Sequence, residues 1–334
     1  MMKFGMGLLF FFVLQSAMAQ RTSSVQNNLV TDNILIQWIN QYPSPGNKNT
    51  HRSFFEQVAR IVFGKKSGLN IRKPNAVLAK SPISYTIMDQ GNEVLFNVEN
   101  EEMRIPKGFK KTKFYFPSLV SMCYLSSTLV LFTDSKLNQL FLLDQVRETL
   151  GLFNTDIILN QPTGIAYSVL SNEIWVVETG AHRIQIFTEK GALVKTIGGR
   201  GSEPGEFNYP TAIWIDKNGK AYIIDSMNFR IQVFDSAGKL VSVFGEPGDA
   251  SGYFARPKGI ATDSFGNIYI TDALFHTVQI FDLSGNYLYN FGEQGRGNGQ
   301  FWMPSGIFID ENNFIYIADS YNSRIQVFQL NKNE

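Results

Sequence analysis

Short apolar runs separated by polar turns follow one another along most of this chain of 334 residues. In the clearest stretch, the four runs are residues 210–216, 221–225, 230–235 and 240–244. They are rich in Ile, Val, Tyr and Phe, and turns such as Asn218-Gly219 stand between them, which is typical of antiparallel hairpins. No segment carries a sustained helical period. The pattern predicts an all-β chain whose unit is a four-stranded meander.

This unit is repeated with a fixed period. The motif Arg-Ile-Gln-Val-Phe, with close variants, occurs four times. Its glutamines follow one another at intervals of 47 residues, at Gln185, Gln232, Gln279 and Gln326. Weaker copies come earlier, and the prolines that open the six units are Pro74, Pro117, Pro162, Pro210, Pro257 and Pro304. The acids that end the second run of each unit are Asp89, Asp134, Glu178, Asp225, Asp272 and Asp319. Such a period, with four strands per unit, predicts a six-bladed β-propeller of four-stranded antiparallel blades.

The two ends of the chain indicate how the ring closes. The last unit reaches Phe328 with six residues beyond it, so it lacks a fourth strand. An apolar-Phe-Gly ending of the missing kind stands at residues 61–64. We therefore expect an N-terminal strand to complete the last blade, with residues 58–63 pairing beside residues 324–328 and covering an exposed sheet edge. Residues 33–39 either add a strand or cover one face.

The repeated phrases allow a family to be named. Pro-x-Gly-Ile-Ala, Gly-Asn-Ile-Tyr-Ile-x-Asp, Asn-x-Arg-Ile-Gln-Val-Phe and Phe-Gly follow one another in a sequence that resembles NHL repeats. The resemblance covers about residues 58–328 and is strongest in the last four units, whereas the first two lack the arginine. Trp38 and residues 42–45 are similar to the segment that precedes the propeller in exported bacterial NHL proteins. The resemblance implies a six-bladed propeller, and propeller lyases and lactonases that NHL proteins resemble rely on metal sites.

The first nineteen residues have the composition of an export signal. Lys3 supplies the positive start, residues 5–14 an apolar stretch, and residues 17–19 a small-residue cleavage site. The stretch is too short to cross a bilayer as a helix, so we expect no membrane span in the mature chain. The predicted division is a signal peptide at 1–19, an N-terminal extension or linker at 20–57 and the propeller at 58–334. The expected location is the periplasm or the extracellular space.

Charge and cysteine content narrow the function further. The formal net charge is +1, and it falls to zero once Lys3 is removed. A neutral chain gives no electrostatic reason to expect a nucleic-acid partner. Cys123 is the only cysteine and lies among apolar residues, which favours a buried small hydrophobe over a nucleophile.

Three groups of residues suggest chemistry, and each has a simpler explanation. The six acids recur at one structural position, where a carboxylate can accept backbone N–H groups or pair with the repeat's arginine. The glycine-rich loops at 198–201 and 295–299 precede strands rather than helices, so they do not form phosphate loops. His51, His182 and His276 are too scattered for a zinc site and are interpreted as solvated loop residues. We therefore predict no catalytic residue, no metal ligand and no cofactor.

Residues that differ from blade to blade are the better candidates for function. The loops that enter the first and third strands open on one face of the disc, and loops on a rigid scaffold carry recognition. On this face we expect a binding surface made by Tyr209, Arg256, Met303, Trp302, Phe275 and His276. Aromatic residues, Met and Arg are favoured at the centres of protein interfaces. The alternative is that several of these side chains fill the space between blades.

The sequence therefore predicts an exported, non-enzymatic propeller that binds a protein or peptide through its loop-rich face as a scaffold or sensor. Two other functions stay open. One is a metal-dependent lyase or lactonase that acts on a small substrate at the central channel. The other is carbohydrate binding on the aromatic loops. Metal analysis of the mature protein separates the enzyme from the binding protein.

Overall fold

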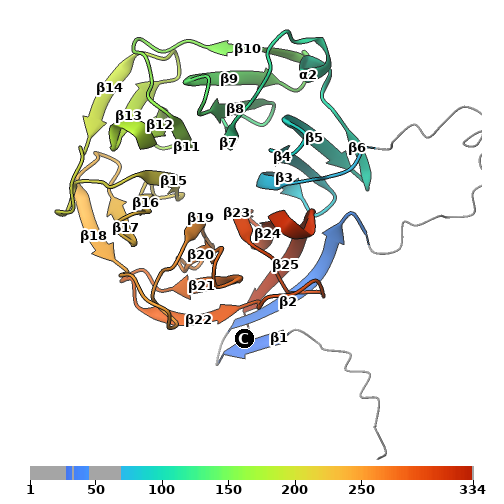
Figure 1. Ribbon diagram of the computed structural model, residues 1–334, viewed down its shortest axis with the longest axis vertical. Helices are drawn as coiled ribbons and strands as arrows, with labels where there is room; N and C mark the ends of the chain where they lie inside the picture. The colour runs from blue at the N-terminus through green and yellow to red at the C-terminus, as the bar shows by residue number, and fades with distance from the viewer. Residues whose placement is uncertain (1–27, 32–33, 45–68, 333–334) are drawn as a thin grey trace, which may run out of the picture.

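The computed structural model describes residues 28–31, 34–44 and 69–332. Their strands form six antiparallel sheets arranged as a closed ring (Figure 1). The strand order within the first five blades follows the chain order, as expected for simple meanders. The predicted fold class, a six-bladed β-propeller of four-stranded antiparallel blades, is confirmed.

The strand bounds repeat closely from blade to blade. The first blade consists of β3 (Pro74–Ser81), β4 (Ser84–Asp89), β5 (Val94–Glu99) and β6 (Glu102–Arg104), and the short helix α2 (Lys107–Lys111) follows it. The second consists of β7 (Leu119–Tyr124), β8 (Leu129–Asp134), β9 (Gln139–Asp144) and β10 (Thr149–Phe153). The third consists of β11 (Pro162–Ser168), β12 (Glu173–Glu178), β13 (Arg183–Thr188) and β14 (Leu193–Ile197), with the 3-10 turn η1 (Thr179–Ala181) before β13.

The later blades follow the same plan. The fourth consists of β15 (Pro210–Ile215), β16 (Ala221–Asp225), β17 (Arg230–Phe234) and β18 (Leu240–Phe244). The fifth consists of β19 (Pro257–Thr262), β20 (Ile268–Asp272), β21 (Thr277–Phe281) and β22 (Tyr287–Phe291). The sixth consists of β23 (Pro304–Ile309), β24 (Phe314–Asp319) and β25 (Arg324–Lys332), with the 3-10 turn η2 (Ser320–Asn322) before β25, and is completed by β2 (Ile34–Tyr42) and β1 (Asn28–Thr31).

The hydrophobic core lies between the blades and not at the centre of the ring. Six clusters of buried side chains occupy the six junctions between neighbouring blades. At the junction of the third and fourth blades, for example, Trp175 and Val177 pack with Phe207 and Ile223. Removing a side chain of this size from water contributes roughly 1.5–3 kcal/mol. The blades are therefore held together by their flat faces, which leaves the first strands to surround the axis (Figure 1).

The ring closes with an N-terminal strand, as predicted, but with a different one. β2 pairs antiparallel with β25, from Tyr42 opposite Ile325 to Ile34 opposite Lys332, and the blue and red ribbons lie side by side in Figure 1. The placement of residues 58–63 at this edge was wrong, because β2 occupies it; residues 58–64 themselves lie outside the described residues. Ile36 packs into the junction with the fifth blade and Tyr42 into the junction with the first, so β2 joins both neighbours.

In the second blade, the structural register differs from the one that the prolines suggest. Leu119, not Pro117, pairs with the acid Asp134, in the way that Pro162 pairs with Glu178. Counting back from Leu119 brings Phe116 to the position of the core aromatics, and Phe116 is buried among Phe109 and Phe132. Phe114, the residue expected in the core from the proline spacing, is 40% exposed. The short helix α2 lies between the first blade and this register shift.

Candidate functional site

The six repeated carboxylates are buried structural groups. Each has a relative exposure of 0%. Asp225 accepts the backbone N–H of Asn208 at 2.6 Å and the Nε–H of Arg230 at 2.8 Å. Asp319 likewise accepts from the backbone of Trp302 and from Arg324. Because their acceptor sites are taken by the loop that enters the same blade, these acids fix the loops and do not form a ligand site.

The two histidines in the repeats also bind the backbone. Nδ1 of His182 accepts the N–H of Tyr209 in the next blade at 3.1 Å, and Nδ1 of His276 accepts the N–H of Met303 at 3.0 Å. Asn138 does the same for Gln161 through its side-chain oxygen. The interpretation of His182 and His276 as solvated loop residues was therefore wrong: His182 is buried, His276 is partly buried, and both connect neighbouring blades.

The loops that enter the first and third strands share one face of the disc, because alternate strands of each blade run in the same direction. We call this the loop face. Tyr209 is 44% exposed there, and its ring lies 4.4 Å from that of His182. Trp302 is partly buried between Arg296 and Tyr321, at 5.2 Å and 5.9 Å. Phe275 is partly buried in the loop after β20.

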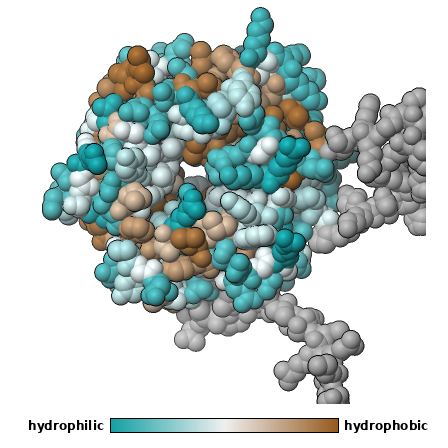
Figure 2. Space-filling view, in the orientation of Figure 1, coloured by the Kyte–Doolittle hydropathy of each residue, from teal (hydrophilic) through white to brown (hydrophobic). Residues whose placement is uncertain are grey.

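Of the six predicted binding residues, two meet at the central channel. Arg256 and Met303 line a cavity of about 500 Å³ that is surrounded by the first strands of all six blades. The other four do not line this cavity, and they are Tyr209, Trp302, Phe275 and His276. The ring of Trp302 contacts that of Tyr321, which does line it. A hollow is visible at the centre of the ring in the space-filling view (Figure 2).

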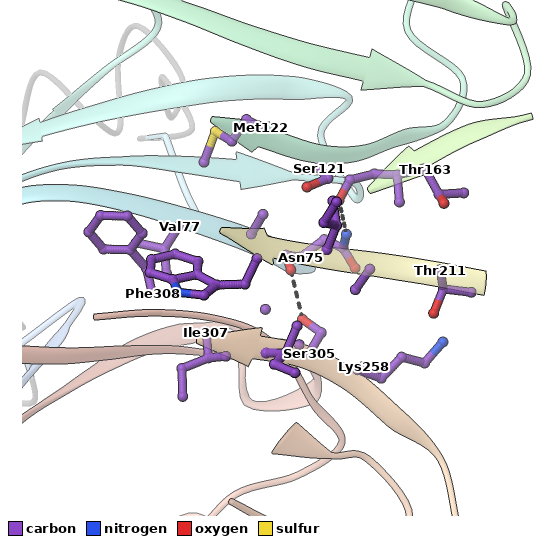
Figure 3. Close-up of a pocket in the computed structure, with 18 of the residues that line it drawn as sticks. Asn75, Val77, Ser121, Met122, Thr163, Thr211, Lys258, Ser305, Ile307 and Phe308 are labelled. Atoms are coloured by element: carbon purple, nitrogen blue, oxygen red, sulfur yellow. Dashed lines mark hydrogen bonds between the residues drawn. The ribbon is translucent and has the colours of Figure 1, made fainter. Parts of the chain in front are cut away.

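The cavity changes character along its length. Each first strand begins on the loop face, so the residues near its start lie at one end of the channel, and these are polar: Asn75, Thr163, Thr211, Lys258 and Ser305. Further along the strands stand Val77, Met122, Ile307 and Phe308. Figure 3 shows Lys258, Thr211 and Thr163 on one side of the view and Val77, Met122 and Phe308 on the other. The ring of Trp214 meets that of Phe308 edge-on at 5.7 Å.

The polar end carries positive charge only. Lys73, Arg256 and Lys258 line the cavity, and no aspartate, glutamate or histidine does. Burial, together with the nearby charges of Arg256 and Lys73, lowers the pKa of the Lys258 ammonium below its usual value. The ammonium of Lys258 therefore lies in surroundings that disfavour a cation and would favour an anion.

Sequence reasoning did not find Lys258, although a signal was present. In the five blades whose first strand opens with proline, the next residue is Asn75, Thr163, Thr211, Lys258 or Ser305, and only Lys258 among them is charged. All five residues line the channel, so a charge at this position is placed at the channel wall. Arg256 was found because it precedes the same proline.

The channel does not have the donors of a metal centre. In the part of the chain that the structure describes, no group of three or more His, Cys, Asp or Glu side chains is placed to hold an ion. Among the cavity residues only Cys123 is of these types, and burial raises the pKa of its thiol to about 12, so it stays protonated at neutral pH. A channel lined by lysine and arginine does not fit a divalent cation.

Comparison with known proteins supports the fold. Residues 154–242 and 262–334 match a family model described as a 6-bladed β-propeller. No curated protein matches the chain in sequence. Within the described ranges, no helix has the length and apolar content needed to cross a membrane.

Three solved structures illustrate the range of proteins with this fold. The chain is similar to an auxiliary nutrient binding protein from Bacteroides ovatus, with 15% identity, a TM-score of 0.61, and coverage of 78% of this chain and 70% of that one. It is similar to virginiamycin B lyase from Staphylococcus aureus, with 15% identity, a TM-score of 0.56, and coverage of 78% of this chain and 97% of that one. It is also similar to hydrazine synthase from Kuenenia stuttgartiensis, with 12% identity, a TM-score of 0.53, and coverage of 80% of this chain and 98% of that one. At such identities the likeness is one of fold, and function has to be argued from the site.

Proposed function

We propose that the protein is exported and acts without catalysis, as a scaffold or sensor that binds a protein or peptide on its loop face. The observation that carries this proposal is a set of exposed apolar side chains on the loop face. Tyr115, Met227, Leu274 and Tyr321 are 65%, 54%, 52% and 55% exposed. All four stand on loops anchored by the buried carboxylates, so they are presented by a rigid frame.

A rigid apolar surface of this kind suits a protein or peptide ligand. Aromatic side chains supply much contact area with little loss of conformational freedom, methionine adapts its shape to a partner, and both are enriched at interface centres. The name of the Bacteroides ovatus neighbour, a nutrient binding protein, is compatible with a binding role.

The test uses a random displayed peptide library and three forms of the full chain. The loop-face variant combines Tyr115→Ala, Met227→Ala and Trp302→Ala, none of which lines the channel cavity. The control variant combines Val169→Ser, Leu170→Ser and Leu283→Ser on the turns of the opposite face, where these residues are 80%, 63% and 53% exposed. Thermal melting confirms that both variants fold.

We expect peptides selected on the wild-type protein to bind the loop-face variant at least about tenfold more weakly, the loss of one good anchor. They should bind the control variant as they bind the wild type. Failure to enrich any peptide, or equal binding to the loop-face variant, would overturn the proposal.

The second candidate is an enzyme that acts on a small substrate in the channel, and the 500 Å³ cavity favours it because ligand sites commonly have this size. In its metal-dependent form it lacks channel ligands among the described residues. Elemental analysis of the mature protein, purified without chelator, distinguishes the two: stoichiometric zinc or calcium would support the enzyme, and a folded metal-free protein would support the binding scaffold.

A further inference from the structure

The charged end of the channel differs from every other arginine-containing site of the repeat. Arg183, Arg230 and Arg324 each pair with the buried acid of their own blade, at 2.5, 2.8 and 2.7 Å. Among the described residues, no ion pair or hydrogen bond engages the side chains of Lys73, Arg256 and Lys258. Lys73 and Arg256 are exposed at the channel mouth, whereas Lys258 is partly buried. The three cations repel one another, and the burial of Lys258 beside two like charges without an acidic partner is unfavourable.

The neutral polar groups beside them are already engaged. The hydroxyls of Thr211 and Ser226 bond to each other at 2.5 Å, and those of Thr163 and Thr179 at 2.7 Å. The side-chain amide of Asn75 donates to the carbonyl of Val120 at 2.6 Å, a bond drawn in Figure 3. The two hydroxyl pairs lie within the fourth and third blades, and the Asn75 bond joins the first blade to the second. The charged donors at this end of the cavity are the cationic groups of Lys73, Arg256 and Lys258.

The opposite end of the cavity offers apolar surface. Trp214 and Phe308 form one wall, and Met122, Val77 and Ile307 stand near them. The indole N–H of Trp214 donates to the hydroxyl of Thr262 at 2.9 Å, which fixes the ring in place. A ligand that reached this end would meet carbon atoms and aromatic faces.

We propose that the channel is a binding site for an organic anion, whose carboxylate, sulfonate or phosphate group contacts Lys258, Arg256 and Lys73 while its apolar body extends toward Trp214 and Phe308. The ligand relieves the mutual repulsion of the cations and buries its own apolar part. This site goes beyond the peptide surface on the loop face. The peptide test changes Tyr115, Met227 and Trp302 and the anion test changes Lys258, so either proposal can fail alone.

The direction of the pKa shift of Lys258 agrees with this site. Its pKa is lowered by burial, by Arg256 and by Lys73, and a bound anion acts in the opposite direction. By linkage, the anion binds the charged form of Lys258 preferentially, and its affinity falls as the pH rises through the pKa of Lys258. The other titratable groups on the channel wall are Cys123, Tyr124, Tyr167 and Tyr321. The pKa values of Cys123, Tyr124 and Tyr167 are raised, so these three groups stay neutral while Lys258 loses its proton.

The experiment compares probes of one shape and different charge by calorimetric titration of the full chain at neutral pH. The probes are 2-naphthoate, 2-naphthyl phosphate and the neutral 2-naphthamide, and inorganic phosphate is titrated alone. The variant is Lys258→Met, which keeps the apolar stem and removes the charge. The matched control is Lys239→Met, on an exposed lysine in the β17–β18 turn that does not line the cavity.

We expect at least one anionic probe to bind about tenfold or more tightly than 2-naphthamide, the effect of one hydrogen bond to a charged group. Whether naphthoate or naphthyl phosphate binds better identifies the oxyanion. Lys258→Met should remove this preference and leave 2-naphthamide unchanged, whereas Lys239→Met should alter neither.

Three results would overturn the site. The first is that no probe binds, and the second is that the neutral and anionic probes bind equally well. The third is that Lys258→Met leaves anion binding unchanged. If inorganic phosphate bound as tightly as 2-naphthyl phosphate, the apolar half of the assignment would be wrong.

Discussion

Two rings of residues surround the axis of this propeller, and they differ in how strictly the residue type is repeated from blade to blade. The six carboxylates that end the second strands are nearly identical in type, fully buried and hydrogen-bonded to the loops of their own blades. The residues after the opening prolines lie at the channel wall and vary in type, and they are Asn75, Thr163, Thr211, Lys258 and Ser305. The contrast teaches that a repeated residue holds the frame, while a varied residue at a repeated position is free to define a site.

The largest effect should come from breaking the carboxylate ring. Asp319→Ala leaves the guanidinium of Arg324 buried without its 2.7 Å partner and frees the N–H of Trp302. We expect a loss of about 3–5 kcal/mol in the free energy of unfolding, measured by urea denaturation. Asp249→Ala, at an exposed loop position, is the control and should change it by less than about 0.5 kcal/mol. A loss below about 1 kcal/mol for Asp319→Ala would mean that the acid ring is not structural.

A somewhat smaller loss should follow from disturbing the closing strand. Ile36 on β2 is 2% exposed and packs at the junction of the fifth and sixth blades. Ile36→Ala should cost about 2–5 kcal/mol of the same free energy, because it removes buried methyl groups and leaves a cavity. Ile39→Ala lies on the same strand but at a position 37% exposed, and it should be nearly neutral. Equal melting temperatures for the two variants would contradict closure by β2.

The hydrogen bonds between blades provide a third test, in which one substitution should lower the stability and another should preserve it. His182 has a left-handed backbone with φ of 55° and accepts the N–H of Tyr209. His182→Ala removes the acceptor and should cost about 1–2 kcal/mol. His182→Asn should retain most of the stability, because Asn138 already performs this role toward Gln161 in the second blade with φ of 56°. Thermal melting of both variants checks this, and equal losses would show that the bond contributes little.

The smallest effect on stability is expected at the channel wall, and its sign is opposite. Lys258 has a lowered pKa in the folded protein, so its charged form destabilises the fold below that pKa, and the penalty is relieved as the pH rises toward the ordinary value of 10.5. Lys258→Met should raise the melting temperature at neutral pH. The difference between variant and wild type should shrink as the pH rises above the lowered pKa.

This measurement isolates Lys258 from the buried tyrosines, which are present in both proteins. A variant that melts below the wild type at neutral pH, or a difference that does not change with pH, would contradict the account of the channel charge.

Most of the propeller fold could be predicted from the sequence, but few of the residues that line the channel could. The 47-residue period of Gln185, Gln232, Gln279 and Gln326 was sufficient for the blades, because each repeat folds by local hairpin pairing. The register of the second blade could not be read from Pro117, since burial of Phe116 decides it. The role of β2 was assigned to other residues because it lacks the Phe-Gly ending of the repeat.

Local sequence therefore determined the strands, the turns and the number of blades, all of which depend on neighbours within one repeat. Tertiary structure alone decided which segment closes the ring and which residues share the channel. Lys73, Arg256 and Lys258 come from two blades that are adjacent neither in sequence nor around the ring. Only the closed ring brings their charges to one cavity, because the curvature of six packed blades sets the distance across the axis.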